Sequence, residues 1–356
     1  MNLFNNIRRT GAPLLIAAAA TLSGCSNSFL YEYEGDCDPK YRVRLHYNYH
    51  LKEADAFPYE VDHVTLNVTD EQGRIVHTHI ESGDALGTGD YEIVLDGKLA
   101  PGKYRLHAWC GTGAMPGSTS FAVHEATDIT DLRCTLLPDP AEGRADAPEG
   151  ADGKHVRREI KDLYHGMTGV LEFPDDEGYH YFDVNLMKNT NSVTVTLVQL
   201  ADSPLEGHLF DFALSTDNAR MEHDNAIIPS ADVTYHAWRN IDAETEIGDV
   251  KGLPEGTQPG TYPAVLGEFN IARVMKDTPL WLNVSRNDTG ADIVRMNLTP
   301  YFILSKPGKY FAMPSQEYLD RQDAYSVMIV LDSNYRWVES YIYINSWKVV
   351  NQDSEV

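Results

Sequence analysis

Short stretches of alternating apolar and polar residues recur along most of the chain. In Tyr41–Tyr49 the apolar positions alternate strictly with charged and polar ones over nine residues. A repeat of two residues is typical of a β-strand with one buried face. The alternation returns in Val64–Val68 and Tyr91–Leu95, and each of these stretches is followed by a turn sequence with Asp and Gly. The pattern predicts an antiparallel β-sandwich in the first part of the chain.

The second part of the chain continues the same pattern. Predicted strands there are 168–173, 179–186, 192–200, 209–214, 280–286 and 292–298. The chain then forms a predicted hairpin, in which Tyr325–Leu331 and 336–344 are joined by a turn at 332–334. Two short helices are predicted, at 155–166 with Gly166 as its end and at 315–325 with Ser315 as its N-cap.

A change of composition at 138–153 suggests a border between two domains. Pro, Gly, Ala and acidic residues dominate this stretch, and no apolar period runs through it. The predicted layout is a leader at 1–24, a tether at 25–36, a β-sandwich at 37–137, a linker or mobile loop at 138–155, and a second β-sandwich at 156–356.

The first 25 residues carry an export pattern. Arg8 and Arg9 precede an apolar run, Ala12–Leu22, which is shorter than the roughly 20 residues that span a bilayer. Basic residues, a short apolar core and small residues before a cleavage point are typical of a secretory signal. The sequence 22–25, Leu-Ser-Gly-Cys, matches a bacterial lipobox, which predicts that Cys25 becomes an acylated N-terminus. The alternative is an ordinary signal peptide with a cysteine nearby by chance.

The net charge argues against some classes of partner, and the cysteines allow one internal disulfide. The formal net charge is −24, and the predicted leader contains two arginines and no acid, so the mature chain is more negative still. Such a charge argues against nucleic acid or an anionic membrane face as a partner. Three cysteines follow Cys25, in a compartment that permits disulfides. Cys110 and Cys134 lie in predicted strands of the same half, so we predict a disulfide between them and a free Cys37.

Motifs for catalysis or metal binding are weak. His77 and His79 share a strand face, but no third ligand stands at a supporting spacing, which favours a solvated strand face. The stretch Gly111–Gly113 precedes a strand and not the helix that a phosphate loop requires, so a hairpin loop is favoured. Asp175–Gly178 lacks the alternating ligands of a calcium loop and is interpreted as an acidic turn. We therefore predict no enzyme, no cofactor and no metal site.

Several segments, taken in order, resemble one known family. They are the lipobox, CDPKYRVRLHYNYH (37–50), ADAFPYEVDHVTLNVTDEQGR (54–74), LAPGKYRLHAWCG (99–111), LYHG (163–166), VNLMKNTNSVTV (184–195), SQEYLDRQDAYSVMIVLD (315–332) and YINSWKVVNQ (343–352). Together they resemble the fimbrial anchor and minor-subunit lipoproteins of the Bacteroides and Porphyromonas group, the FimB-type family. The resemblance covers nearly the whole mature chain. It departs at Cys110-Gly111, where a Gly-Gly pair is expected.

The resemblance implies two transthyretin-like antiparallel β-sandwich domains in tandem, with short helices in the connections. It also implies a surface-exposed lipoprotein, held in the outer membrane through acylated Cys25, that anchors the base of a fimbrium and supports adhesion. Its implied partners are stalk or accessory pilin subunits, joined by β-strand exchange. Stalk subunits of this class lose an N-terminal strand by cleavage at a basic residue. Arg42 and Arg44 lie inside a strongly patterned strand, so we expect this strand to be protected and retained.

The C-terminal segment 346–356 has two interpretations. Trp347, Val349 and Val350 would lie along an extended edge and could be donated to a neighbouring subunit as the exchanged strand. Alternatively, 347–350 is the last strand of the second domain itself. Both hold in turn if an edge strand pairs at one time within its own sheet and at another with a neighbour.

Two other classes of function remain open. A glycan-binding surface lipoprotein of a polysaccharide-uptake system would need clustered exposed aromatic residues, whereas the five tryptophans are scattered along predicted strands. A lipid-anchored enzyme would need a pocket in which acids or histidines converge.

Overall fold

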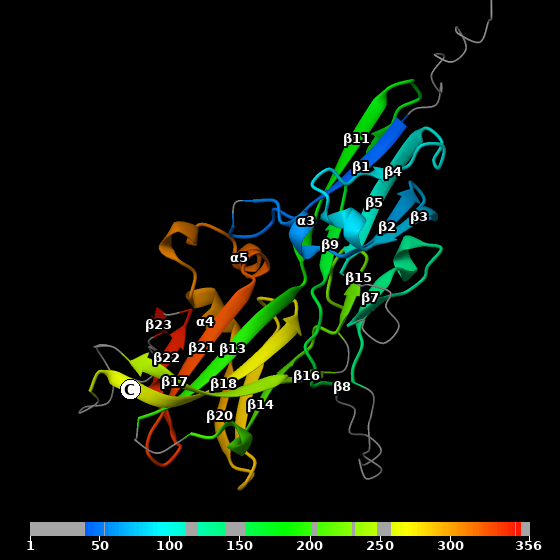
Figure 1. The fold of residues 1–356 in the computed structure, drawn as a ribbon. Coiled ribbons are helices and arrows are strands. Elements are labelled where there is room, and N and C mark those ends of the chain that lie inside the picture. Colours follow the sequence, from blue (N-terminus) through cyan, green and yellow to red (C-terminus); the bar gives the residue numbers. More distant parts are fainter. Residues whose placement is uncertain are drawn as a thin grey trace, which may run out of the picture.

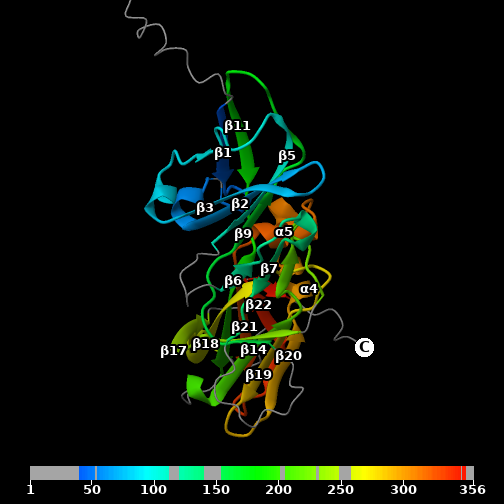
Figure 2. The ribbon, with the colours of Figure 1, turned by 90° about the vertical axis from the view of Figure 1, so that its right-hand side faces the viewer.

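The computed structural model describes eight stretches of the chain. They are residues 40–52, 54–111, 120–139, 154–200, 205–229, 232–247, 258–345 and 347–349. In these residues the chain forms two β-rich units placed end to end (Figure 1), with the first above the second in the view turned by 90° (Figure 2). The predicted all-β fold is confirmed, and short helices occur only in connections.

The first unit packs a three-stranded sheet against a larger one. The order is β11-β1-β4 in the small sheet and β12-β9-β5-β2-β3 in the larger, where β10 also pairs with β5. Its elements are β1 (Lys40–His46), α3 (Phe57–Glu60), β2 (His63–Asp70), β3 (Ile75–Ser82), η1 (Asp84–Gly87), β4 (Ile93–Val94), β5 (Gly102–Cys110), β9 (Tyr164–Met167), β10 (Leu171–Phe173), β11 (Tyr179–Asn185) and β12 (Met187–Lys188). Alternate side chains of these strands form one hydrophobic core, because a strand presents every second residue to one face.

The second unit packs a six-stranded sheet, β17-β18-β13-β21-β22-β23, against a five-stranded one, β20-β19-β14-β16-β8. Its strands are β8 (Lys154–Val156), β13 (Thr190–Gln199), β14 (Phe210–Thr216), β16 (Val233–His236), β17 (Arg239–Ile247), β18 (Gly260–Ala272), β19 (Trp281–Arg286), β20 (Asp292–Asn297), β21 (Ala324–Leu331), β22 (Trp337–Ile344) and β23 (Trp347–Val349). Its helices are η3 (Gly207–Leu209), α4 (Thr299–Leu304), η4 (Gly308–Tyr310) and α5 (Ser315–Arg321). A second and larger hydrophobic core fills the space between these sheets.

A small third sheet, β15-β7-β6, lies between the two units in Figure 1. It consists of β6 (Phe121–Val123), β7 (Arg133–Leu136) and β15 (Arg220–Glu222), and η2 (Ile129–Asp131) precedes β7. The buried residues of this sheet belong to the core of the second unit.

The structure divides the strands between the units differently from the predicted border. Strands β6 and β7 precede that border but pack in the second core, whereas β9 to β12 follow it and complete the first unit. The stretch 138–155 therefore connects β7 to β8, two strands whose buried residues belong to the same core, while residues 140–153 lie outside the described residues. The reason is that sheets form by pairing between segments that are distant in sequence, and local composition does not report such pairing.

Within the described stretches three strand pairs are parallel, which the sequence did not indicate. Strand β1 pairs in parallel with β11 over seven residues, β13 with β21 over eight, and β8 with β16 over three. Parallel partners need a long crossover, and here the crossover runs through the other sheets of the same molecule.

The helix predicted at 155–166 is not present. Strand β8 ends at Val156, the chain continues without a helix, and β9 begins at Tyr164. The apolar residues that gave a helical spacing, Val156, Ile160 and Leu163, are all buried in the second core. An extended segment reaches the same core with these three side chains while it delivers β9 to its partner β5 in the first unit.

Other local predictions are confirmed. Strand β1 buries Tyr41, Val43 and Leu45 and leaves the alternate side chains partly exposed. The terminal hairpin forms as β21 and β22. The helix predicted from Ser315 forms as α5, although Pro314 occupies the N-cap position and Ser315 is the first helical residue.

Candidate functional site

The N-terminal strand β1 is held on both of its edges. On one edge it pairs with β11 along its full length, and on the other Arg42 and Val43 pair with β4. Its inward side chains, Tyr41, Val43 and Leu45, are almost completely buried. Removing β1 from its sheet would therefore open a groove between β11 and β4 and expose the core of the first unit.

The two arginines of β1 are both engaged in ion pairs. The Arg42 guanidinium contacts the Asp96 carboxylate, and its side chain is only 15% exposed. Arg44 donates from Nε to a carboxylate oxygen of Glu92 at 2.8 Å and stacks over the Tyr181 ring at 3.9 Å. The hydrogen bond to Asp96 raises the pKa of Arg42, and the hydrogen bond to Glu92 raises that of Arg44. The basic side chains that a cleaving protease would need are thus bound within the first unit.

The C-terminal strand β23 is held much more weakly. It lies at the edge of the six-stranded sheet and pairs only with β22, through Ile342–Val349, Tyr343–Lys348 and Ile344–Trp347. The pairing of β22 with β21 is itself interrupted by a bulge between Ile329 and Leu331. The predicted strand at the C-terminus is therefore present and pairs within its own sheet, while Val350 lies outside the described residues.

The predicted disulfide between Cys110 and Cys134 is not present. Both cysteines are free thiols, and both are buried. Cys110 on β5 faces the first core, whereas Cys134 on β7 lies in the second. Burial raises the pKa of both thiols, so they behave as small apolar side chains. Cys25 and Cys37 lie outside the described residues.

The weak metal and loop motifs keep local structural roles. His77 and His79 do share a face of β3, and burial lowers the pKa of each. A ring nitrogen of His79 lies 3.2 Å from the Tyr91 hydroxyl. In the acidic turn, Asp176 accepts a hydrogen bond from the Gly178 N–H at 2.8 Å. Across the described residues no three His, Cys, Asp or Glu side chains are placed to hold a metal ion.

The first glycine of the predicted hairpin loop has a steric role. Gly111 has a φ of +78°, and a Cβ at this position would stand 2.1 Å from the Asp162 carbonyl oxygen. Only glycine fits here, because it tolerates positive φ and allows the close approach of the two backbones. Residues 112 and 113 lie outside the described residues.

The junction between the two units was not foreseen from the sequence. On one side the Leu51 N–H donates to the Arg321 carbonyl at 3.2 Å, and the Tyr47 hydroxyl donates to the Asp323 carboxylate at 3.1 Å. The Arg321 guanidinium also lies 3.9 Å from the Tyr49 ring centroid. These contacts join the end of β1 directly to the start of β21, although 276 residues separate Tyr47 from Asp323.

A second part of the junction is made by buried imidazoles. His165 Nε2 donates to the His223 carbonyl at 2.9 Å, and the His165 ring packs against Trp109 with a centroid distance of 4.5 Å. His107 lies against the His223 ring at 5.9 Å. Burial lowers the pKa of His107 and of His165 to about 4, so both are neutral at physiological pH. The sequence did not indicate this cluster, because His107, His165 and His223 are far apart along the chain and no motif connects them.

Beneath the junction, inside the second unit, lies a buried polar network. Arg273 forms a bidentate ion pair with Asp320, at 2.7 and 2.8 Å, and donates to the Asn225 carbonyl at 2.9 Å. The side-chain amides of Asn189 and Asn225 form two reciprocal hydrogen bonds at 2.6 and 3.1 Å. These groups are satisfied by one another, and the network fixes α5 against β18 and the turn after β15.

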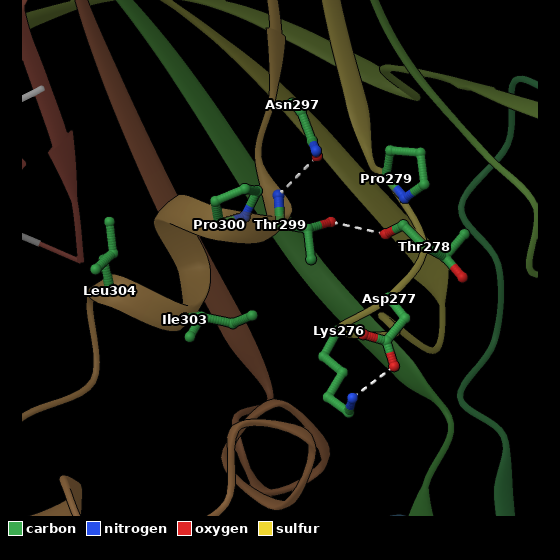
Figure 3. A pocket seen from close by; sticks show the side chains of 9 residues that line it. All are labelled: Lys276, Asp277, Thr278, Pro279, Asn297, Thr299, Pro300, Ile303 and Leu304. Atoms are coloured by element: carbon green, nitrogen blue, oxygen red, sulfur yellow. Dashed lines mark hydrogen bonds and ion pairs between the residues drawn. The ribbon is translucent and has the colours of Figure 1, made fainter. Parts of the chain in front are cut away.

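A pocket of about 450 Å³ opens beside α4 (Figure 3). It is lined by Lys276, Asp277, Thr278, Pro279, Asn297, Thr299, Pro300, Ile303 and Leu304. Asn297 at the end of β20 accepts hydrogen bonds from the N–H groups of Leu280 and Thr299, both at 3.1 Å. The Thr299 hydroxyl donates to the Thr278 carbonyl at 2.9 Å, which fixes the walls of the pocket.

The tryptophans do not form an extended aromatic platform in the described structure. Trp109 is completely buried, and Trp238 and Trp337 are half-buried. Trp281, on the outer face of the five-stranded sheet, is 43% exposed. For Trp347 the structure describes the backbone pairing of β23 alone.

A family model and several solved structures match this chain over most of its length. A family model described as fimbrillin-A associated anchor proteins Mfa1 and Mfa2 matches residues 33–353. A solved candidate adhesin from Bacteroides thetaiotaomicron is 29% identical, with a TM-score of 0.71, over 89% of this chain and 99% of its own. The fimbrial anchor protein Mfa2 from Porphyromonas gingivalis is 16% identical, with a TM-score of 0.61, over 88% of this chain and 100% of its own.

A further solved structure has the same fold and carries a different description. This candidate polysaccharide-binding protein from Bacteroides thetaiotaomicron is 22% identical, with a TM-score of 0.69, over 89% of this chain and 99% of its own. A search of curated proteins finds no match to the chain.

The fold and these matches define a fimbrial protein of the anchor and adhesin type. The chain belongs to the family of fimbrillin-A associated anchor proteins Mfa1 and Mfa2, because the family model covers most of its length. This is a family of structural proteins of the fimbrium. None of the helices in the described residues is long and apolar enough to cross a membrane.

Proposed function

We propose that this chain is a lipid-anchored outer-membrane subunit that holds the base of a fimbrium and joins the adjoining pilin subunit by β-strand exchange. Family membership supports the anchor role, and the lipobox at Cys25 supports membrane attachment. The observation that carries the proposal is the contrast between the terminal strands. Strand β1 is paired on both edges, whereas β23 is held at a sheet edge by three residue pairs.

Retention of β1 is what a lipid anchor requires. The acylated N-terminus at Cys25 is continuous with β1, so cleavage within β1 would separate the protein from the membrane. The pairing of β1 with β11 and β4, together with the ion pairs of Arg42 and Arg44, supports resistance to such cleavage. A protease gains access to a paired strand only after local unfolding.

The C-terminal strand is the segment that we propose for exchange. When β23 leaves its own sheet, it loses the backbone hydrogen bonds of three residue pairs with β22, and each of these hydrogen bonds has a net contribution of about 1 kcal/mol. A longer strand bound in the groove of a neighbouring subunit gains backbone hydrogen bonds along its length and side-chain contacts on one face.

Deletion of residues 346–356 tests this proposal. We expect the truncated protein to remain folded and membrane-bound while fimbriae are released into the medium, because the donated strand is missing. The matched control is deletion of 353–356, which leaves Trp347–Val350 in place and should retain fimbriae. Mass spectrometry of the mature N-terminal peptide should show an acylated Cys25 in both proteins.

Two results would contradict the proposal. Normal fimbrial retention by a folded 346–356 deletion would remove this segment from the mechanism, and a free N-terminus at another residue would remove the lipid anchor. Loss of folding on deletion would assign β23 to its own sheet alone.

A further inference from the structure

The pocket beside α4 lies next to the ends of β19 and β20, two strands of the five-stranded sheet. Trp281 pairs directly with Asn297 across β19 and β20, so their side chains stand next to each other on one face. Asn297 also lines the pocket, as does Pro279, two residues before Trp281. The half-exposed indole of Trp281 therefore stands beside Asn297, a residue of the pocket lining, although Trp281 itself does not line the pocket. The Arg295 guanidinium lies over the indole, 5.9 Å from its ring centroid.

The polar groups at this place leave hydrogen-bonding capacity for a ligand. The Asn297 carbonyl oxygen is engaged by two backbone N–H groups, which orients its NH₂ group as a donor that no described hydrogen bond uses. Lys276 and Asp277 pair with each other at 2.5 Å at the pocket mouth, with the Asp277 carboxylate 80% exposed.

The chemistry of the lining selects the class of ligand. The charged residues of the pocket lining, Lys276 and Asp277, pair with each other, so the lining itself carries no net charge. Its apolar surfaces come from Pro279, Pro300 and Ile303, next to an exposed aromatic ring. A ligand that fits has apolar faces together with many uncharged donors and acceptors, and a sugar ring combines these properties. The volume lies within the range of small-molecule sites.

We propose that Trp281 and the pocket beside α4 form a binding site for an uncharged saccharide unit of an oligosaccharide. The sugar ring stacks on the indole of Trp281, and its hydroxyl groups bond to the Asn297 amide and to Asp277 and Lys276 at the mouth. The site lies in the second unit, apart from β1 and β23, so it is independent of the proposed strand exchange.

The test is binding of the full soluble chain to an array of uncharged oligosaccharides of glucose, galactose, mannose and N-acetylglucosamine. The strongest binder is then titrated against the wild type and three variants by calorimetry. Trp281→Ala and Asp277→Ala change exposed side chains at the site. Tyr59→Ala removes an aromatic side chain that is 88% exposed in the first unit, and serves as the matched control.

We expect Trp281→Ala to weaken binding at least about tenfold, which corresponds to about 1.4 kcal/mol, and Asp277→Ala to weaken it less. Tyr59→Ala should bind as the wild type does. Absence of binding to every oligosaccharide overturns the proposal, as does binding that Trp281→Ala leaves unchanged. Occupation of the pocket by a segment of another protein, seen as protection of Ile303 and Leu304 in a complex, also overturns it.

Discussion

At the scale of single residues, the buried histidines are the groups most sensitive to their surroundings. His107 and His165 lie where the two units meet, and burial holds the pKa of each at about 4, against about 6.5 for an exposed histidine. The unfolded chain therefore binds protons at a pH where the folded protein does not. Above pH 6.5 both states leave these histidines neutral, so their titration does not affect the free energy of unfolding. As the pH falls from 6.5 toward 4, protonation of the unfolded chain lowers that free energy.

The expected result is a fall in the free energy of unfolding between pH 6.5 and pH 4, of roughly 3 kcal/mol for each of the two histidines. Urea unfolding at several pH values measures it. His63, His77 and His79, whose pKa values are also lowered, add smaller contributions in the same range. Carboxylates with lowered pKa values, such as Asp55 and Asp128, act only below this range.

The double variant His107→Gln and His165→Gln separates the pH dependence that arises from these two histidines from that of the other titrating groups. Its stability should depend less on pH between 6.5 and 4, because glutamine does not titrate there and still offers an N–H donor. An unchanged slope would show that the pH dependence arises elsewhere in the molecule.

At the scale of elements, the long sheet edges differ in how they are protected. The edge strands of the second unit carry charged side chains, including Arg239, Asp242 and Glu244 on β17 and Arg295 on β20. Such charges oppose unwanted pairing with another chain. Strand β1 is protected from such pairing in another way, because neighbouring strands pair with both of its edges.

This pairing predicts resistance of β1 to trypsin. In the native protein we expect no cleavage after Arg44, because the bond lies in a paired strand. Val43→Asp places a charge at a position that is completely buried, which loosens β1 and should accelerate this cleavage by at least about tenfold. Peptide mapping after limited digestion measures the rate.

Val94→Asp is the matched control for this experiment. It makes the same substitution on the neighbouring strand, opposite Arg42, at a side chain that is 50% exposed. Its cleavage rate after Arg44 should equal that of the wild type. Rapid cleavage of the wild-type protein in its folded state would remove the argument that β1 is retained.

At the scale of the whole molecule, the junction joins the end of β1 to the six-stranded sheet that contains β23. Asp323 accepts a hydrogen bond from Tyr47 and lies 3.4 Å from the Lys52 ammonium, and β21 starts at the next residue. Under the proposed function, a pull on the fimbrium acts between the lipid anchor and the C-terminal strands. The contact between Tyr47 and Asp323 links the end of β1 to the start of β21 noncovalently.

Replacing Asp323 with Ala should therefore weaken the connection between the units. We expect a loss of about 1.5–3 kcal/mol in the free energy of unfolding, because the buried Tyr47 hydroxyl loses a charged acceptor. Hydrogen exchange should accelerate in residues 47–52. Asp323→Asn keeps an oxygen acceptor and should lose much less, so equal losses in both variants would assign the effect to something other than this hydrogen bond.

The sequence alone determined the features that depend on local pattern. The strand character of β1, the hairpin of β21 and β22, and the helix α5 follow from the spacing of apolar residues and from turn residues, which act within a few positions. The likeness of whole segments indicated the family, which the match to residues 33–353 confirms.

Only the tertiary structure decided the features that depend on distant partners. It placed β9 to β12 with the first unit, replaced the helix at 155–166 by an extended segment, and put Cys110 and Cys134 in separate cores. It also brought Tyr47 to Asp323 and Trp281 to Asn297 in the pocket lining. A strand pattern specifies which face of a strand is buried but not which strand will be its neighbour, because that choice depends on the packing of all the sheets together.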